Sequence, residues 1–502
     1  MGKFLIGWAE ESLVPDKKVE IGGQFYERIS EYVESPVTAT AMAIEADGEQ
    51  AIIVSCDLTG LSGGVLNIAR EKFAAYNTGV DPMKVIVGVT HTHTSIKHTK
   101  PNVEKVETGF SKNILNEFLP ADKQYTQLVK AENRDDIMDT GEATLFLADK
   151  IALAAKRAWE NRAEAMYANA FGRAVVGHCR RVCYDDGSAA MWGDTNSANF
   201  TALEGGNDSG IELLYMFDKN KKLTGIVANI ACPSQVLEHR SFISADYWGK
   251  VKENLRKEYG EDIYLLAMCG AGGDQCPRDM IRWVNPETPI NDPNITREHY
   301  IERVADPSMF DLSGCRVIGR RVSNEIISVL QEVTELKDEA VFKHEAFVMQ
   351  LPLRKATKAQ YNEAVREIRH YVEQNKDKAE FNFADSAAMH VYAGTIGRYR
   401  DQQFTETYDT EIHVIRFGDI AIATNPFELF LDYGNRIKAR SLAKQTFIMQ
   451  LTCGDGGGYL PTEKAEQGSH YSAYISSGQV GHEGGDMMVR KDIDVINAMF
   501  KE

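Results

Sequence analysis

The chain has 502 residues, 43% of them hydrophobic, so it can bury one large core or two ordinary ones. Its net charge of −17 argues against nucleic acid or an anionic membrane as the main partner. No run approaches the roughly 20 apolar residues of a membrane span, and the N-terminal apolar stretch is too short for a secretion signal. The eight cysteines form no Cys-x-x-Cys pair, which favours reduced thiols in a cytoplasmic protein.

Strands and helices are predicted to alternate along the chain. An Asp-Gly turn at 47–48 predicts a hairpin between strands at 37–46 and 51–58, and a helix near 63–75 leads to an apolar β-branched strand at 84–90. Periodicity predicts further strands at 210–217, 223–231, 263–268, 411–417, 419–424 and 446–452. It predicts further helices at 143–165, 246–259, 312–333 and 426–442, and one within 355–380. No linker or repeat divides the chain. We therefore expect one α/β domain over residues 1–502, with layered mixed β-sheets flanked by helices.

Two histidines follow the predicted strand at 84–90, within the run Thr-His-Thr-His-Thr-Ser at 90–95. At positions i and i+2 of an extended chain, His91 and His93 point to the same side. Imidazoles held at a strand end beside hydroxyls suit a transition-metal site or a general acid–base pair. The alternative is a polar loop with two solvated histidines.

Other reactive side chains also lie just beyond predicted strands or at the start of a helix. They are Cys232 after the strand at 223–231, Asp274 and Cys276 in a glycine-rich loop after 263–268, Glu428 at the start of the helix at 426–442, and Tyr459 in a second glycine-rich loop. Loops beyond strand ends are where layered α/β folds assemble their sites. The run Gly-Ala-Gly-Gly-Asp-Gln at 270–275 lacks the spacing of a phosphate loop, so we expect a close backbone approach there.

Taken in this order, the segments resemble the catalytic domain of the neutral/alkaline (non-lysosomal) ceramidase family. The run at 90–94 is similar to that family's Thr-His-Thr-His-Ser motif, whose first histidine binds zinc and whose second lies in the substrate pocket. The resemblance implies a zinc-ligand role for His91 and a pocket role for His93. It also implies the layered α/β fold of that catalytic domain.

Four further residues match elements of the family. Arg180, in Cys-Arg-Arg, is similar to an Asn-Arg element that lines the pocket. Glu428, in Asn-Pro-Phe-Glu-Leu, resembles a Pro-Gly-Glu element and would be a zinc ligand. Tyr459, in Gly-Tyr-Leu-Pro-Thr, resembles the family's zinc-binding tyrosine, and Tyr471 matches a pocket tyrosine further along.

Two segments depart from the family pattern. Ceramidases carry Gly-Gly-Asp-Val-Ser-Pro-Asn with the serine as proposed nucleophile, whereas this chain has Gly-Gly-Asp-Gln-Cys-Pro-Arg at 272–278, with Cys276 in the serine's place. They also carry Ala-x-His-Pro-Thr, whose histidine binds zinc. Here Ala-Cys-Pro-Ser at 231–234 puts Cys232 at or beside that position, and His239 is the other candidate. With neither a secretion signal nor an immunoglobulin-like C-terminal domain, the chain resembles a cytosolic, single-domain relative for which ceramide is a poor substrate guess.

The resemblance implies a Zn²⁺ site with His91, Glu428 and Tyr459 as ligands and with Cys232 or His239 as a fourth. Zinc in such a site polarises a carbonyl and lowers the pKa of bound water toward about 7. Each residue has a plainer alternative: a helix-dipole contact for the glutamate, ring packing for the tyrosine, and burial as an inert thiol for the cysteine.

The remaining candidates would perform the chemistry. His93 could relay a proton, and Asp274 could orient a ligand or the nucleophile. Arg180, Cys276 and Tyr471 complete the catalytic set. Cys276 has two readings, because the neighbouring aspartate would raise the pKa of its thiol while a nearby arginine and loop amides would lower it.

From these residues we expect a zinc-dependent hydrolase of the neutral-ceramidase superfamily that cleaves an amide or related bond in a small polar substrate. One alternative is a metal-assisted lyase or hydrolase of sugar or uronic-acid derivatives. Another is a non-catalytic relative that binds a metal or ligand. The expected partner is a small-molecule substrate, and association into a homo-oligomer stays open.

Overall fold

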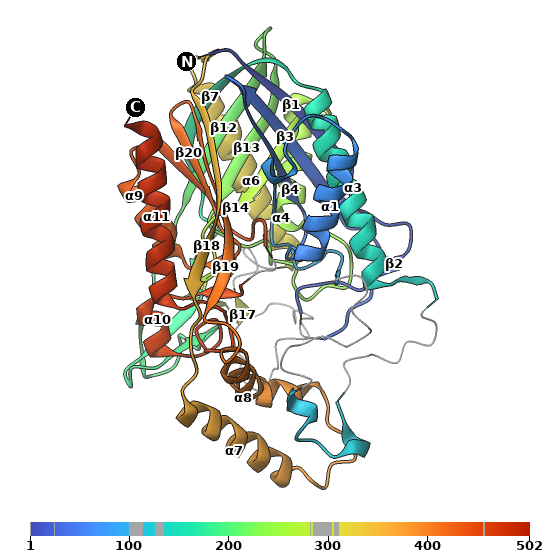
Figure 1. Cartoon of the computed structure of the whole chain (residues 1–502), viewed down its shortest axis with the longest axis vertical. Coiled ribbons are helices and arrows are strands. Elements are labelled where there is room, and N and C mark those ends of the chain that lie inside the picture. The colour runs from blue at the N-terminus through green and yellow to red at the C-terminus, as the bar shows by residue number, and fades with distance from the viewer. Residues whose placement is uncertain are drawn as a thin grey trace.

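The computed structural model of the protein describes residues 2–24, 26–99, 114–125, 135–281, 283–284, 304–305, 311–454 and 457–501. Two β-sheets pack together, and helices lie on both sides of them (Figure 1). This arrangement confirms the layered mixed α/β architecture predicted from the sequence. Among the described helices, none combines the length and the apolar composition that crossing a membrane requires.

The larger sheet has eight strands, and its neighbouring strands are antiparallel except at the two ends, where β4 pairs with β5 and β13 with β14 in parallel. In spatial order the strands are β14 (Tyr264–Cys269), β13 (Leu223–Ile230), β12 (Gly210–Asp218), β7 (Ala163–Arg173), β1 (Phe4–Ser12), β3 (Thr38–Ala46), β4 (Glu49–Cys56) and β5 (Val85–Val89). The predicted hairpin is confirmed, since Asp47 and Gly48 connect β3 to β4 with positive φ angles of 51° and 81°.

The larger sheet curls back on itself, because β14 at one edge contacts β3, β4 and β5 at the other. Helices α1 (Gly63–Ala75) and α3 (Thr140–Glu160) cover the part made of β1, β3 and β4. Helices α4 (Asp246–Tyr259) and α6 (Asp311–Gln331) cover the part made of β7, β12, β13 and β14. The curl encloses a continuous apolar core, whose side chains come mainly from strands rich in valine and isoleucine.

The smaller sheet is formed by the last third of the chain. Its strands, in spatial order, are β18 (Phe342–Pro352), β19 (Thr407–Phe417), β20 (Ile420–Thr424) and β22 (Gln445–Met449). Strands β20 and β22 run parallel, and β22 contacts β12, β13 and β14 of the larger sheet. Helices α9 (Leu431–Arg440) and α11 (His482–Phe500) pack on the other face of the smaller sheet.

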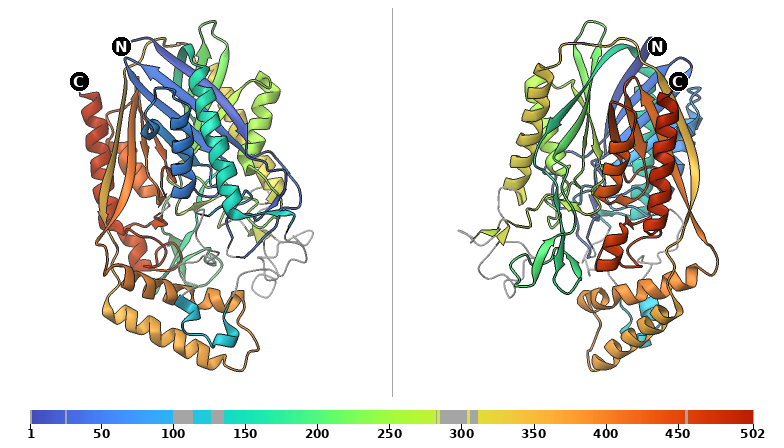
Figure 2. Two further views of the ribbon diagram at one scale, coloured as in Figure 1. Left: turned by 45° about the vertical axis from the view of Figure 1, so that its right-hand side comes forward. Right: turned by 90° about the vertical axis from the view of Figure 1, so that its left-hand side faces the viewer.

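A pair of helices lies at the end of the molecule away from both termini (Figure 2). These are α7 (Lys358–Gln374) and α8 (Phe383–Asp401), which begin at capping boxes formed by Thr357 and Asn382. Residues 114–125 pack on them in a small apolar cluster. The solvated helix predicted within 355–380 is confirmed as α7.

The other described elements are short. They are β2 (Lys18–Val19), β6 (Ile137–Met138), β8 (His178–Cys179), β9 (Arg181–Tyr184), β10 (Ala189–Met191), β11 (Phe200–Leu203), β15 (Gln275–Cys276), β16 (Trp283–Val284), β17 (Val304–Ala305), β21 (Glu428–Leu429), β23 (Tyr459–Leu460), α10 (Glu463–Gly468) and the 3₁₀ turns η1 (Pro82–Lys84) and η2 (Ala121–Lys123). Several of them hold the candidate site.

Candidate active site and metal centre

The segments singled out in the sequence do follow the ends of strands. Strand β5 ends at Val89, β13 at Ile230, β14 at Cys269 and β20 at Thr424. The loops beyond these ends contact one another: the backbone N–H of His93 donates to the carbonyl oxygen of Ser234 at 3.2 Å, and that of Gly273 to the carbonyl oxygen of Leu429 at 2.8 Å. This confirms the predicted placement of the loops.

His91 is held in a fixed orientation. Its φ angle of 62° lies in the left-handed region, which a non-glycine residue adopts at a cost of about 1–2 kcal/mol. Its Nδ1 hydrogen-bonds to the carbonyl oxygen of Thr59, beyond the end of β4. A carbonyl oxygen can only accept, so Nδ1 carries a proton, and in the neutral ring Nε2 then carries the lone pair that a metal-binding histidine needs.

The lone pair on His91 faces two other groups that can accept a proton or bind a cation. Nε2 of His91 lies 3.4 Å from Oε2 of Glu428 and 3.4 Å from Nε2 of His93. The two imidazole rings meet edge to face with their centroids 4.8 Å apart. The two imidazoles do face each other, but not as residues i and i+2 of an extended chain, because His91 lies in the left-handed region.

Glu428 is joined to Tyr459 by a short parallel ladder. Strands β21 and β23 place Glu428 opposite Tyr459. The carbonyl oxygen of Glu428 also lies only 2.3 Å from the position that a Cβ on Gly273 would occupy, so the backbone can approach only because residue 273 is glycine. The close backbone approach predicted for the glycine-rich run at 270–275 is therefore confirmed. Glu428 itself was expected in a helix, but it lies in β21, ahead of the helix that begins at Leu431.

Arg180 connects this ladder to the histidine side of the site. Its guanidinium donates to the hydroxyl oxygen of Tyr459 at 3.3 Å, to the carbonyl oxygen of Gly273 at 3.0 Å, and to Oε1 of Gln235 at 3.1 Å. Gln235 in turn donates to the carboxylate of Glu238 at 3.0 Å. The ring of Tyr471 packs edge to face on that of Tyr459, with centroids 5.5 Å apart. The structure thus brings Arg180, Tyr459 and Tyr471 together, as the resemblance implied.

The protonation states follow from burial and neighbouring charges. Burial favours the neutral acid, but the hydrogen bond and charge of His91 and the charge of Arg180 lower the pKa of Glu428 below its ordinary value. Burial, His91 and nearby arginines lower the pKa of His93 well below its ordinary value, so His93 is neutral near pH 7. An ionised Glu428 and a neutral His93 therefore lie beside the His91 ring.

This donor set fits a metal ion. The unshared electron pair of His91 Nε2 and the ionised Glu428 would repel each other at 3.4 Å without a proton or cation between them. Nitrogen and oxygen donors of this kind suit Zn²⁺, and Tyr459 lies beside Glu428 as a third donor. The residues that could hold the metal are therefore His91, Glu428 and Tyr459.

Neither candidate for a fourth ligand, Cys232 or His239, lies with His91, Glu428 and Tyr459. Cys232 is fully buried, and its Sγ contacts the carbonyl oxygen of Pro233 at 3.5 Å. Within the described residues, no group that contains Cys232, His91 and Glu428 has its ligand atoms all within 4.8 Å of one another. His239 turns instead toward Asp311, with 3.9 Å between Nε2 and Oδ1. A fourth protein ligand stays a prediction.

Asp274 and Cys276 lie beside Arg180, whose backbone N–H donates to the carbonyl oxygen of Asp274 at 2.9 Å. One carboxylate oxygen of Asp274 accepts the backbone N–H of Leu431 at 2.9 Å, at the start of α9, and burial raises the pKa of Asp274 to about 6. Cys276 pairs with His178 across β15 and β8. Burial raises the pKa of the Cys276 thiol to about 12, although Arg180 acts in the opposite direction. The thiol is therefore protonated at neutral pH.

A second cluster of possible metal ligands was not predicted. The ligand atoms of Glu411, His413 and Cys453 lie within 4.8 Å of one another. Arg70 already occupies this cluster, since its guanidinium donates to both oxygens of Glu411 at 2.6 and 3.0 Å and lies 3.5 Å from the Cys453 sulfur. Glu411 and His413 sit at positions i and i+2 of β19, the same spacing that singled out His91 and His93 in the sequence.

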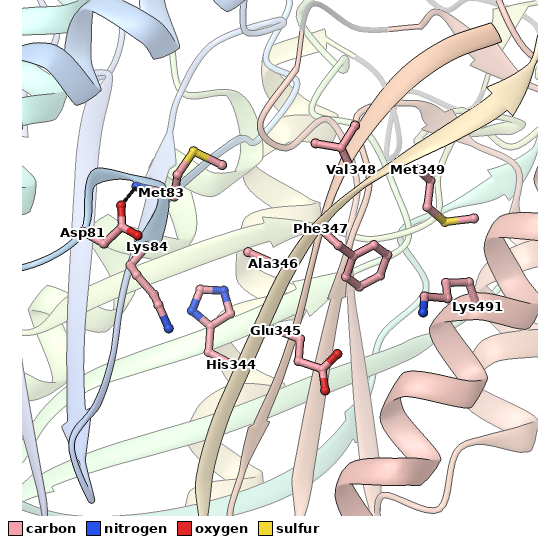
Figure 3. A pocket seen from close by; sticks show the side chains of 10 residues that line it. All are labelled: Asp81, Met83, Lys84, His344, Glu345, Ala346, Phe347, Val348, Met349 and Lys491. Atoms are coloured by element: carbon pink, nitrogen blue, oxygen red, sulfur yellow. Dashed lines mark hydrogen bonds between the residues drawn. The ribbon is translucent and has the colours of Figure 1, made fainter.

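This second cluster reaches the surface through His344. His413 Nδ1 lies 2.9 Å from Nε2 of His344, which lines a hollow of about 740 Å³ along the edge strand β18 (Figure 3). Asp81, Lys84 and Lys491 also line the hollow. It shares no lining residue with the site around His91, so the described part of the chain contains two separate groups of candidate ligands.

The chain is similar to known proteins in structure but not in sequence: no family model and no curated protein matches it. The neutral ceramidase from Pseudomonas aeruginosa superposes with a TM-score of 0.65 at 14% identity, over 99% of this chain and 75% of the other. A ceramidase complexed with C2 superposes with a TM-score of 0.64 at 12% identity, over 100% and 76% of the two chains. The chain therefore has the neutral ceramidase fold, as the sequence motifs implied.

Proposed function

We propose that the protein is a zinc-dependent hydrolase that cleaves an amide or related bond in a small polar substrate. The observation that carries this proposal is the convergence of His91 Nε2 and Glu428 Oε2 at 3.4 Å beside Tyr459. The arrangement lies at strand ends in a chain with the neutral ceramidase fold. His91, Glu428 and Tyr459 would hold the metal.

When bound, zinc would polarise the substrate carbonyl and lower the pKa of a bound water to about 7. His93 supplies the base. A carboxylate oxygen of Glu238 lies 3.7 Å from its Nδ1, without a hydrogen bond to it, and would partly offset the charge of the imidazolium that forms when Nε2 takes a proton. The same nitrogen then returns the proton to the leaving amine. Arg180 and Tyr471 line the pocket where the substrate carbonyl would lie.

The protein needs no covalent nucleophile in this scheme. The serine of the ceramidase motif is replaced by Cys276, whose buried thiol is protonated at neutral pH and donates to the carbonyl oxygen of Arg278 at 3.2 Å. A thiolate is the nucleophilic form of cysteine. We therefore assign the attack to water and treat Cys276 as part of the site wall.

The second candidate function is a lyase acting on uronic-acid derivatives, and it is favoured by the buried cation of Arg180, which could bind a carboxylate. In that reaction His93 would remove a proton α to the carboxylate. The two functions differ in their products, because a lyase creates a double bond that absorbs ultraviolet light and a hydrolase does not.

The metal content of purified protein tests the proposed function. We expect about one zinc per chain in the wild type, loss of that zinc in Glu428→Gln, and its retention in Cys453→Ala, which removes a donor from the second cluster alone. Chelation should abolish hydrolysis of a panel of small amides, and added zinc should restore it. Zinc that survives Glu428→Gln but disappears in Cys453→Ala would place the ion in the second cluster and contradict the proposal.

A further inference from the structure

Two adjacent arginines of the site wall are buried in very different surroundings. Arg181 is fully buried, and its Nε donates to the carboxylate of Glu204 at 2.8 Å. Its remaining donors reach four acceptors in the segment 465–472. This arginine is paired and satisfied, so it has a structural role.

Arg180 is 3% exposed, yet its hydrogen bonds end on neutral groups. The acceptors are Oε1 of Gln235, the carbonyl oxygen of Gly273 and the hydroxyl oxygen of Tyr459. Its Nε is buried and has no hydrogen-bond partner among the described residues. Burying a cation without an anion that hydrogen-bonds to it is unfavourable, and an anionic ligand in contact with it would compensate.

A second arginine lies against the same indole as Arg180. The guanidinium carbons of Arg180 and Arg278 lie 5.7 and 5.4 Å from the ring centroid of Trp192. The backbone N–H of Trp192 donates to the carbonyl oxygen of Arg180 at 2.8 Å, and its φ of 60° holds this residue in the left-handed region. A half-buried indole therefore lies against two cations.

Arg278 is also a departure from the ceramidase motif, which has asparagine at the corresponding position of the Gly-Gly-Asp-Gln-Cys-Pro-Arg run. The change adds a positive charge to the site wall. Arg278 lies against Trp192, and so does Arg180. Arg180 in turn donates a hydrogen bond to Tyr459. Arg180 and Arg278 also both act on the Cys276 thiol, whose pKa they lower against the effect of burial, so the added charge belongs to the same wall as Arg180.

We propose that Arg180 and Arg278, beside Trp192, form a subsite for a carboxylate carried by the substrate. This inference rests on the proposed hydrolase function and names its substrate class: a small amide that bears a carboxylate near the scissile bond. Nε of Arg180 would donate one charge-assisted hydrogen bond to the carboxylate and the guanidinium of Arg278 would pair with it, while the indole offers a flat surface for the adjoining planar amide.

The test compares two probes of almost the same shape, N-acetylglycine and its neutral analogue N-acetylglycinamide. Binding to the purified protein is measured by calorimetry and by quenching of tryptophan fluorescence, with Trp192→Phe identifying the responding ring. We expect N-acetylglycine to bind at least tenfold more tightly than the amide, and Arg278→Gln to remove most of that preference. Arg278→Lys should restore part of it, and Arg366→Gln, an exposed change on α7, should leave it intact.

Equal affinity for the two probes, including no detectable binding of either at millimolar concentration, would overturn the inference. Tighter binding of inorganic phosphate than of N-acetylglycine would overturn the assignment to a carboxylate. The outcome is separable from that of the proposed function. A carboxylate preference that persists in a protein without metal or hydrolysis refutes the function alone, whereas equal hydrolysis of neutral and anionic amides refutes the subsite alone.

Discussion

His91 and Glu428 come from different sheets and meet with 3.4 Å between Nε2 and Oε2. His91 follows β5 of the larger sheet, and Glu428 follows β20 of the smaller one. In the neutral His91 ring, whose proton is used at Nδ1, both atoms are hydrogen-bond acceptors. An ion between them would therefore join the two sheets.

The first prediction concerns thermal stability. A metal present at 100 times its dissociation constant stabilises the folded state by about 2.7 kcal/mol. We expect chelation to lower the melting temperature of the wild type by a few degrees and to leave that of Glu428→Gln unchanged, because this variant has already lost the ion. Differential scanning calorimetry with and without chelator measures both. An equal shift in the two proteins would locate the stabilising ion elsewhere.

The second prediction concerns Cys276. Since the Cys276 thiol is buried and protonated, we expect the kcat of Cys276→Ala to stay within about tenfold of the wild-type value. Loss of a true nucleophile lowers kcat by a factor on the order of 10⁶ in a serine protease. Alkylation of the native protein at Cys276, followed by mass spectrometry, should be slow up to pH 9 or so. A collapse of activity in the alanine variant would instead support the nucleophile predicted as one alternative from the sequence.

The third prediction concerns pH and stability at Asp246, the first residue of α4. Burial raises the pKa of its carboxyl to about 7, although the backbone N–H groups of Leu237 and Tyr247 donate to it. The folded protein therefore binds a proton more tightly than the unfolded chain, and this residue's contribution to stability falls as pH rises from about 4 to about 7.

Asp246→Asn removes that titration. We expect the free energy of unfolding of the wild type, measured relative to the variant in urea, to decrease across this pH interval by up to about 4 kcal/mol and then to level off. The variant differs from the wild type only at residue 246, so the difference between their free energies of unfolding reports the titration of one carboxyl group. A difference that is constant with pH would show that Asp246 titrates normally.

The fourth prediction concerns the ion pair of Arg70 and Glu411. Burial alone would raise the pKa of Glu411, but the hydrogen bond from His413 and the pair with Arg70 lower it to about 2. Breaking a buried pair leaves an uncompensated charge, so Glu411→Gln should destabilise the protein by about 3–5 kcal/mol. Urea unfolding gives this value. Metal content should not change, because Arg70 already holds the carboxylate.

The sequence supported prediction of the fold and of the separate parts of the site. Apolar strands such as β5 and β14 are short, continuous and bounded by glycine or polar residues, so their ends could be located and the residues beyond them identified. The pairing of Glu428 with Tyr459 could not be found in this way. Strands β21 and β23 have two residues each, too few to show any periodicity.

The cluster around Glu411 was missed for a related reason. His344 meets His413 because β18 and β19 pair in a register that places Ala346 opposite His413. The spacing within β19 could have marked Glu411 and His413, but nothing local indicates that Arg70 on α1 reaches them. Contacts between distant segments depend on the packing of whole elements, which local patterns do not report.

The contact between Gly273 and Glu428 joins a loop that follows β14 to a strand that follows β20. On the ribosome, the chain emerges with His91 and Arg180 long before Glu428 and Tyr459. Domains generally fold as units, and contacts between distant segments form late. A nascent chain would thus expose two histidines without their partners until Glu428 and Tyr459 have been synthesised. Binding of a metal ion at the proposed site would then follow synthesis of Tyr459, and a translation product truncated before Glu428 would lack the site.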